Sequence, residues 1–527
     1  MNEGSGERRG APAYLLPVLI GSLVSFLLGL VLGMVWSPLG RSSSGTTPPA
    51  AGAEDAQAEA DEATAPAAEP EPVPEEPVAR AADDTADLVC FRGNPQRNLS
   101  GVGSVPRHPK LIWRFRTKTK HEGPYEQRGD PLLTSSTPWH GLGWTGQPCI
   151  VDGRVYFGST DSYVYCLDLA TGREIWHYGL HHSIKGSISV IDGAIFHGGR
   201  DNKVRRYDLD GRMVWETRIG QDTDSNPIVA DGKLLIGGED NTVYAFDPDY
   251  GSVIWSYGPT NGSCESSPCY AEDTVTIGSS GGSLYCLNAK TGDLIWEYAT
   301  GGDGDPTPVY SEGRIYHAAE MGGGRERGKV HCLDLGTGEL VWSRDMPRGI
   351  WATPAVSPER GRVYIGCNDG TLYCLDTSDG STLWERELTG ARIWSSPVVS
   401  DGAILVGVRD GTLWCLDESM GEPIWVFDEG YDIDATPAVA QGMIVVGSQN
   451  GWVYGIADDP SQARLNPHWF RAGPDYDLRT DLNPVGVRTI ESSAPEPQAH
   501  RDTHAGYRES YLEPVYGPAY TRMRPPR

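Results

Sequence analysis

From residue 147 onward, short apolar stretches alternate with turns rich in Gly and Asp. Within residues 147–176 this pattern predicts strands at Pro148–Val151, Val155–Gly158, Tyr163–Leu167 and a last stretch ending at Trp176. Turns such as Asp152-Gly153 separate them, because Gly tolerates the positive φ of a tight hairpin. Four short strands in about 40 residues are typical of one blade of a β-propeller.

The same pattern recurs along the chain and ends each time in a tryptophan. It is clearest in Cys166–Trp176 (CLDLATGREIW), Cys286–Trp296 (CLNAKTGDLIW) and Cys332–Trp342 (CLDLGTGELVW). Successive copies are about 40 residues apart, as propeller blades are. We expect the repeat tryptophans to be buried between blades, each with one partner for its ring N–H. They are Trp113, Trp176, Trp215, Trp255, Trp296, Trp342, Trp384 and Trp425.

Two incomplete copies predict how the ring closes. Leu111–Phe115 contains Trp113 but has no strands before it, whereas Thr436–Ile456 has early strands but no tryptophan strand after it. The first fragment supplies the tryptophan strand that the second lacks, and the second supplies the early strands that the first lacks. The sequence therefore predicts an all-β fold of eight four-stranded antiparallel blades over residues 90–460, closed by the N-terminal strand, which leaves no free sheet edge in the ring.

These repeats resemble those of pyrroloquinoline quinone (PQQ) type propellers. That family includes quinoprotein dehydrogenases and non-catalytic propellers such as the scaffold lipoprotein of the outer-membrane β-barrel assembly machinery. The segment Phe91–Gly101 (FRGNPQRNLSG) also resembles a lead-in found before such bacterial propellers. The resemblance implies the fold, and it leaves function open because one fold hosts many activities.

The chain outside the repeats predicts where the protein works. Residues 14–36 form an uncharged apolar run long enough to cross a membrane as a helix, and no small-residue cleavage site or lipidated cysteine follows it. Arg8 and Arg9 before the run favour a cytoplasmic segment 1–13 and a propeller in the periplasm. We expect a single-pass protein of the bacterial inner membrane, and a monomer.

Two flanking segments have the composition of disordered chain. Residues 37–89 are rich in Ala, Pro and Glu, and residues 41–89 contain 12 acidic and 2 basic residues, which predicts an extended linker. Residues 461–527 show no periodic pattern and are predicted to be a disordered tail. The net charge of −27 argues against nucleic acid and permits cationic ligands, metal ions or basic protein partners.

The ten cysteines do not predict a disulfide framework. Five share one repeat position on successive blades, which lie too far apart to be bridged. Cys264 and Cys269 are close in sequence and form the one pair worth checking, while Cys90 has no evident mate and could link to a partner. No zinc-ligand spacing occurs.

Candidate site residues lie where the chain enters the first strand of each blade. A Pro ends most of these entry segments, and three residues before it stand Asp224, Glu265, Asp305, Trp351, Trp394 and Asp434. Asp222, Asp303 and Asp432 stand five before it, and Lys185 takes the matching place in a blade without the Pro. Because first strands are innermost, these residues predict an acidic channel mouth.

Crowded carboxylates favour a bound cation. Asp224, Glu265, Asp305 and Asp434 are the candidate ligands of a metal such as calcium, and the indoles beside them suit an amine or quaternary cation. An acidic pore without any ligand is the alternative. The segment Glu320–Lys329 (EMGGGRERGK) predicts a mobile loop on the same face, either a surface insertion or a lid carrying Arg325, Arg327 and Lys329 over the acids.

Two functions stay open at this stage. The first is a non-catalytic binding or scaffold module for protein partners in the cell envelope, with no cofactor and no catalytic residue. The second is a PQQ- or calcium-dependent dehydrogenase. That branch of the family stacks PQQ between a tryptophan and a disulfide of adjacent cysteines, and no two cysteines are adjacent here. No nucleophile–base or phosphate-loop motif indicates another chemistry.

Overall fold

The computed structural model describes residues 83–118, 146–180, 182–321, 327–458 and 470–472. The predicted transmembrane helix 14–36, the cytoplasmic segment and most of the linker and tail lie outside these residues. No helix within the described ranges is long and apolar enough to cross a bilayer.

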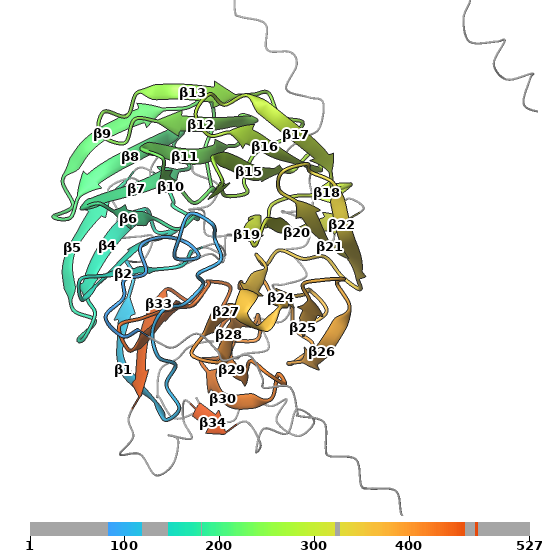
Figure 1. Cartoon of the computed structure of the whole chain (residues 1–527). Helices are drawn as coiled ribbons and strands as arrows, with labels where there is room; N and C mark the ends of the chain where they lie inside the picture. Colours follow the sequence, from blue (N-terminus) through green and yellow to red (C-terminus); the bar gives the residue numbers. More distant parts are fainter. Residues whose placement is uncertain (1–82, 119–145, 181, 322–326, 459–469, 473–527) are drawn as a thin grey trace, which may run out of the picture. The chain divides into compact units, whose positions relative to one another are not determined.

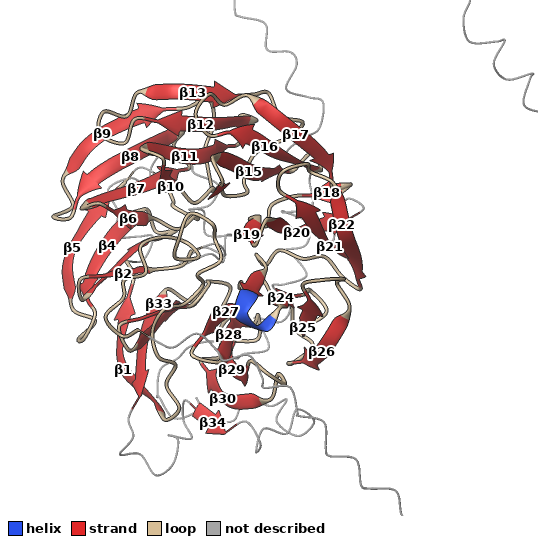
Figure 2. Cartoon of the chain, in the orientation of Figure 1, coloured by secondary structure: helices blue, strands red, loops and turns tan. Residues whose placement is uncertain are grey.

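The described residues form eight antiparallel sheets arranged as the blades of a ring (Figures 1 and 2). Blades 1 to 4 consist of β2 (Cys149–Val151), β3 (Arg154–Gly158), β4 (Tyr163–Asp168) and β5 (Glu174–Gly179); β6 (Ser189–Ile191), β7 (Ala194–Gly199), β8 (Lys203–Asp208) and β9 (Met213–Arg218); β10 (Ile228–Ala230), β11 (Lys233–Gly238), β12 (Thr242–Phe246) and β13 (Val253–Tyr257); and β14 (Cys269–Ala271), β15 (Thr274–Ser279), β16 (Ser283–Asn288) and β17 (Leu294–Ala299).

Blades 5 to 8 follow the same order from the channel outward. Blade 5 consists of β19 (Val309–Ser311), β20 (Arg314–Met321), β21 (Arg327–Asp334) and β22 (Leu340–Met346), and β18 (Gly302–Asp303) also pairs with β20. Blade 6 consists of β23 (Ala355–Ser357), β24 (Arg362–Gly366), β25 (Thr371–Asp376) and β26 (Thr382–Glu387), with the 3-10 helix η4 (Pro358–Arg360) between β23 and β24. Blade 7 consists of β27 (Val398–Ser400), β28 (Ala403–Gly407), β29 (Thr412–Asp417) and β30 (Pro423–Asp428), and blade 8 consists of β31 (Ala438–Ala440), β32 (Met443–Gly447), β33 (Trp452–Asp458) and β1 (Pro109–Arg116).

The strand β1 completes blade 8, as the two incomplete repeats predict. It pairs antiparallel with β33, and Trp113 lies opposite Gly455. The inner strands β31 and β2 are in contact, so the last blade meets the first. The fourth strand of each blade is longer than predicted: β5 continues from Trp176 to Gly179, because its pairing with β4 extends beyond the tryptophan.

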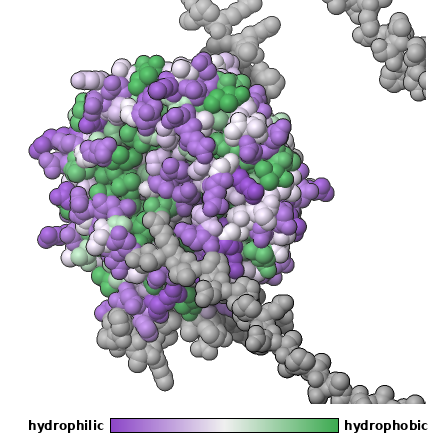
Figure 3. Space-filling model, viewed as in Figure 1, coloured by the Kyte–Doolittle hydropathy of each residue, from purple (hydrophilic) through white to green (hydrophobic). Residues whose placement is uncertain are grey.

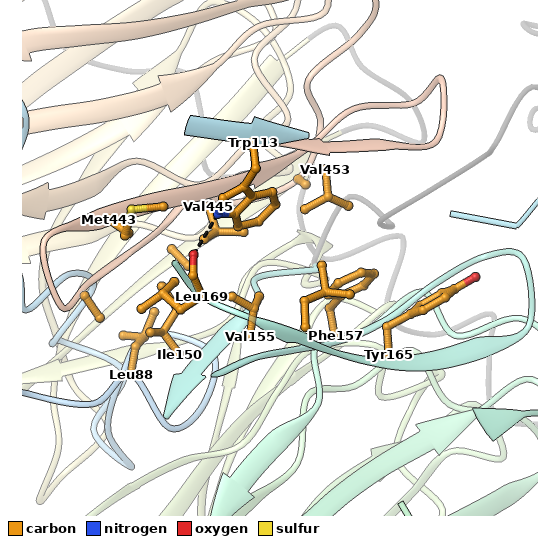
Figure 4. Close-up of a cluster of buried hydrophobic side chains, with 14 of the residues drawn as sticks. Leu88, Trp113, Ile150, Val155, Phe157, Tyr165, Leu169, Met443, Val445 and Val453 are labelled. Atoms are coloured by element: carbon orange, nitrogen blue, oxygen red, sulfur yellow. Dashed lines mark hydrogen bonds between the residues drawn. The ribbon is translucent and has the colours of Figure 1, made fainter. Parts of the chain in front are cut away.

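The repeat tryptophans dock each blade onto the next one, which confirms their predicted role. The Nε1 of Trp113 donates to the Leu169 carbonyl of blade 1 at 2.7 Å, within a cluster that joins blades 8 and 1 (Figure 4). Gly172 has φ +66, and a Cβ there would lie 2.4 Å from the Trp113 ring, so the Gly of the repeat is required for the close approach. Trp384 departs from the pattern, because its Nε1 has no hydrogen-bond partner among the described residues.

All ten cysteines are buried free thiols. The five that share a repeat position lie directly opposite the tryptophan of the neighbouring strand, as Cys166 lies opposite Trp176. The suggested pair Cys264–Cys269 is not bonded, and burial raises the pKa of both thiols to about 12. The prediction that Cys90 could link to a partner is wrong for this conformation, since its side chain is 1% exposed.

The lead-in, residues 88–102, lies in the centre of the ring, where Figure 1 draws it in blue. Leu88 bridges Ile150 of blade 1, Val190 of blade 2 donates to Val89, and Val102 donates to Val439 of blade 8. Residues 83–89 were predicted to belong to the disordered linker, and this boundary is wrong, because Leu88 is fully buried against the inner strands. The lead-in therefore lies against the inner strands of several blades, which the sequence analysis did not predict.

Two further segments differ from the predictions. Within Glu320–Lys329, the pairing of β20 with β21 reaches Met321 and Arg327, and Lys329 contacts Asp345 at 3.2 Å instead of lying over the acids. Residues 322–326, with Arg325 of the predicted lid, lie outside the described residues. In the tail, β34 (Phe470–Ala472) pairs with the outer strand β30 of blade 7.

The outer strands otherwise face solvent. The residue before each repeat tryptophan is exposed in seven blades, while its counterpart Ile424 on β30 is half-buried. On the side shown in Figure 3, apolar residues form small separate patches among hydrophilic ones. Blade 7 is thus the one blade in the described ring whose outer edge is covered by a fifth strand.

Candidate functional site

The channel mouth is built from two positions of each repeat, both held by backbone hydrogen bonds. The first is the entry segment before the inner strand, which contains the predicted residues. The second is a residue at or just beyond the end of the second strand, two positions after a small residue (Gly, or Ala318 in blade 5), and it is here called the turn residue. Its N–H donates to the carbonyl five residues before the entry Pro, as in Glu239 to Asp222, Ser280 to Ser263 and Gln449 to Asp432.

The turn residues include charged groups that the sequence analysis missed. They are Thr160, Arg200, Glu239, Ser280, Glu320, Asn368, Arg409 and Gln449. The signal was available, because in seven of the eight repeats this residue stands two positions after a Gly near the end of the second strand, and in blade 5 it stands two after Ala318. Only the fold shows that this position meets the entry segment of the next blade.

At blades 2 to 4 the predicted residues form an ion-pair cluster. Asp224, with a side chain 1% exposed, contacts Lys185 at 3.0 Å and Arg200 at 2.9 Å, and Arg200 also contacts Asp222 at 3.2 Å. Burial raises the pKa of Asp224, but the two cations outweigh it and leave that pKa below its usual value. Asp224 is therefore ionised and paired.

Glu239 and Glu265 belong to the same cluster but are poorly compensated. Burial, with repulsion from Asp224, raises the pKa of Glu239 to about 9 and that of Glu265 to about 7. Arg200 lies 3.5 Å from Glu239 and does not offset this. Burial and the neighbouring acids thus disfavour the charged form of both carboxyl groups, and a cation close to them would oppose this effect.

At blade 5 the Asp303 and Asp305 side chains hydrogen-bond each other, and neither forms an ion pair with a cation of the described residues. Burial and repulsion from Asp303 and Glu265 raise the pKa of Asp305 well above its usual range, and burial also raises the pKa of Asp303. The Oδ1 atoms of both residues are buried and have no hydrogen-bond partner within the described residues. Glu320 adds a further negative charge to Asp305.

At blades 6 to 8 an aromatic stack replaces the acid cluster. Trp351 and Trp394 stack with their ring centroids 4.1 Å apart, which confirms that the two predicted indoles lie side by side. The Arg409 guanidinium lies 3.6 Å from the Trp394 centroid and contacts Asp432 at 3.0 Å and Asp434 at 3.2 Å. Burial still raises the pKa of Asp434 to about 7, despite Arg409.

Within the described residues, one group has the geometry to hold a metal ion. Carboxylate oxygens of Asp224, Glu239 and Glu265 all lie within 4.8 Å of one another. Of the four predicted ligands, Asp224 and Glu265 belong to this group, and Asp305 and Asp434 do not. A divalent cation here would compete with Lys185 and Arg200, which already neutralise Asp224.

The fold is similar to those of several solved propellers. BamB from Moraxella catarrhalis has 18% identity and a TM-score of 0.53, over 66% of this chain and 99% of that one. A europium-containing methanol dehydrogenase has 16% identity and a TM-score of 0.57, over 70% and 98% of the two chains. The quinohemoprotein alcohol dehydrogenase from Comamonas testosteroni has 15% identity and a TM-score of 0.58, over 73% and 82%. At these identities the similarity concerns the fold.

The residues of the channel do not fit PQQ. The centre of the channel holds the lead-in. Its residues Arg92 and Arg97 are fully buried and donate to backbone carbonyls, so they are not available to pair with the anionic cofactor. The mouth would place carboxylates against the carboxylates of the cofactor. The chain also lacks the adjacent cysteines on which dehydrogenases of this type stack the cofactor.

The sequence itself matches one family model. The model described as outer membrane protein assembly factor BamB matches residues 105–263, 239–325 and 326–466, which together span more than half of the chain. A search of the curated proteins found no match. The docking tryptophans, the eight blades and this match lead to one conclusion: the chain belongs to the PQQ-like β-propeller family represented by the outer membrane protein assembly factor BamB.

Proposed function

We propose that this chain is a membrane-anchored, periplasm-facing and non-catalytic binding module that takes up basic segments of protein partners at its channel mouth. The observation that carries the proposal is the excess of carboxylates over cationic side chains at the rim, that is, at the entry segments and turn residues around the channel mouth. Lys185, Arg200 and Arg409 face a larger set of carboxylates, several of which have pKa values raised to about 7 or above.

A binding role agrees with how this rim is built. Its positions lie at the ends of short, paired strands and are held by repeated backbone hydrogen bonds, so little ordering is needed when a ligand binds. The family description and BamB from Moraxella catarrhalis support a partner in envelope protein assembly.

The anchor is part of the same proposal. The apolar run 14–36 would hold the chain in the inner membrane, and the acidic linker would keep the ring away from the anionic bilayer surface. Deleting residues 14–36 should release the chain from membranes washed with carbonate. Retention of the deleted form in the membrane fraction would contradict the anchor.

Thermal unfolding of the detergent-purified full chain tests the binding role. A ligand present at about 100 times its dissociation constant stabilises the folded state by about 2.7 kcal/mol. We expect trilysine and triarginine to raise the unfolding temperature, and a Gly-Ser peptide of equal length to leave it unchanged. Stabilisation by PQQ with calcium, and not by the basic peptides, would instead support a PQQ-dependent oxidoreductase, the alternative that the structural relatives raise.

A further inference from the structure

Three pairs of aspartates occupy the same two places in three repeats. Asp222 and Asp224, Asp303 and Asp305, and Asp432 and Asp434 stand five and three residues before the entry Pro of blades 3, 5 and 8. Each pair lies next to the turn residue of the preceding blade: Arg200 contacts Asp224, Gly304 donates to the Ser279 carbonyl at 3.2 Å, and Ile433 donates to the Val408 carbonyl at 3.2 Å. The three pairs can therefore be compared as one site in three versions.

In two versions an arginine bridges the pair. Arg200, the turn residue of blade 2, contacts Asp222 at 3.2 Å and Asp224 at 2.9 Å. Arg409, the turn residue of blade 7, contacts Asp432 at 3.0 Å and Asp434 at 3.2 Å. One guanidinium thus spans both carboxylates each time, as expected of a planar group with several fixed donors.

In the third version the turn residue is Ser280. Its N–H makes the same backbone bond to the entry segment as the other turn residues do, so its position in the blade is unchanged. Its hydroxyl lies 2.9 Å from that of Ser263 and is too short to reach across both aspartates. Within the described residues, no ion pair to Asp303 or Asp305 occurs. Their buried Oδ1 atoms lack hydrogen-bond partners, as do the Oδ1 atoms of Asp224 and Asp434. The missing arginine, and not the orphaned oxygen, therefore distinguishes the third version.

The surroundings of the third pair are more acidic than those of the blade 8 pair. Beside Arg409 lies Trp394, with its ring centroid 3.6 Å from the guanidinium, whereas Glu265 holds the equivalent place beside Asp305. Glu320 lies close to Gly349, two residues before Trp351, since a Cβ on this Gly would approach the Glu320 carboxylate. Glu320 thus adds a carboxylate between Asp305 and the entry segment of blade 6, which contains the half-buried Trp351.

We propose that Asp303 and Asp305 receive the guanidinium of an arginine side chain from a protein partner. The inference rests on the proposed binding function and names the residue that the mouth recognises. Arginine is favoured over lysine because the two filled versions use a bridging fork that an ammonium group cannot reproduce. It is favoured over a metal ion because the group with metal-binding geometry lies at Asp224, Glu239 and Glu265 instead.

The first test supplies the missing arginine from within the chain. Ser280→Arg places a guanidinium at the position that Arg200 and Arg409 occupy in their blades. We expect Ser280→Arg to raise the unfolding temperature of the full chain by about 2 °C, and Ser280→Gln to leave it unchanged. The gain should vanish in Ser280→Arg combined with Asp303→Asn and Asp305→Asn. No gain in the single variant, or a gain that survives the triple change, would overturn the inference.

The second test measures peptide affinity on the full chain. Triarginine should bind at least about 10-fold more tightly than trilysine, the difference expected for one good charge-assisted pair. Asp305→Asn and Ser280→Arg should each abolish that preference, whereas Asp210→Asn, a change at an exposed site away from the mouth, should keep it. Equal binding of the two peptides would overturn the inference while leaving the proposed basic-peptide function intact.

A third variant tests whether an arginine of this chain already occupies the aspartate pair. Arg325 lies in the hairpin between β20 and β21 and outside the described residues. Arg325→Gln should leave the triarginine affinity unchanged. A large rise in affinity would show that Arg325 already occupies the aspartate pair, which would overturn the assignment of this site to a partner.

Discussion

The lead-in and the channel mouth both place charged groups near the ring axis, but the buried Arg97 of the lead-in is compensated by hydrogen bonds and several carboxylates of the mouth are not. Arg97 is fully buried, and its guanidinium donates to the carbonyls of Pro268, Phe91 and Asn226 at 2.7–2.8 Å. At the mouth, Glu265 and Asp434 are held among other carboxylates, and burial raises the pKa of each to about 7.

The difference shows which part holds the ring together and which part is available for binding. A buried cation whose three nitrogens each donate to a backbone carbonyl stabilises the blades it spans and is not exposed to a ligand. Carboxylates that lack partners lower the stability of the folded chain, and a cation that pairs with them recovers that free energy. Three substitutions would sharpen or break this comparison.

The largest effect is expected from Arg97→Met. The change removes three hydrogen bonds and leaves the Pro268 and Asn226 carbonyls buried without donors. We expect the free energy of unfolding to fall by about 3 kcal/mol or more, measured by chemical denaturation. Because carbonyls do not take up protons, the loss should be the same at pH 5 and pH 8. Arg212→Met is the matched control, since the Arg212 side chain is 77% exposed; equal losses in the two variants would refute the role of the lead-in.

A smaller and pH-dependent effect is expected from Arg409→Met. At pH 8 the variant leaves Asp434 without its cation and removes the stacking on Trp394, so we expect a loss of about 2 kcal/mol. At pH 5 the Asp434 carboxyl can take a proton in the folded state, and the loss should shrink. A loss that is independent of pH would show that Arg409 acts through packing alone.

The smallest effect, and a gain, is expected from Glu265→Gln. The folded-state pKa of Glu265 is raised to about 7, so its contribution to stability is present at low pH and is lost as the pH rises from about 4.5 through 7. The neutral amide avoids that loss. We expect the variant to be more stable than the parent by about 1 kcal/mol at pH 8 and equally stable at pH 4.

Glu339→Gln, at an exposed position, is the control for this measurement and should have no effect at either pH. A loss of stability in Glu265→Gln at pH 8 would mean that the carboxylate is already compensated by a cation. In that case the contrast between the lead-in and the mouth would fail at this residue.

The local repeat was sufficient to predict the ring. Each copy contains its own strands, turns and docking tryptophan, and the Gly before that tryptophan strand is required where the indole of the neighbouring blade approaches. The pairing of β1 with β33 was also predictable, because the two ends of the repeat array carry complementary fragments.

The lead-in shows what the pattern could not indicate. Phe91–Gly101 is short, contains two arginines and has no strand periodicity, so nothing local predicts that it is buried. Its arginines become acceptable in the interior only because the blades direct carbonyls toward the axis. The same holds for β34, whose partner β30 is distant in sequence.

The sequence by itself determined the number and order of the blades, the docking tryptophans and the acidic character of the entry segments, because these depend on residues within one repeat. The tertiary structure decided which acids are paired. Arg200 and Arg409 meet carboxylates of the following blade, while Ser280 leaves Asp303 and Asp305 without an arginine. Such contacts join residues of different repeats, and their distances are set by the curvature of the ring rather than by spacing along the chain.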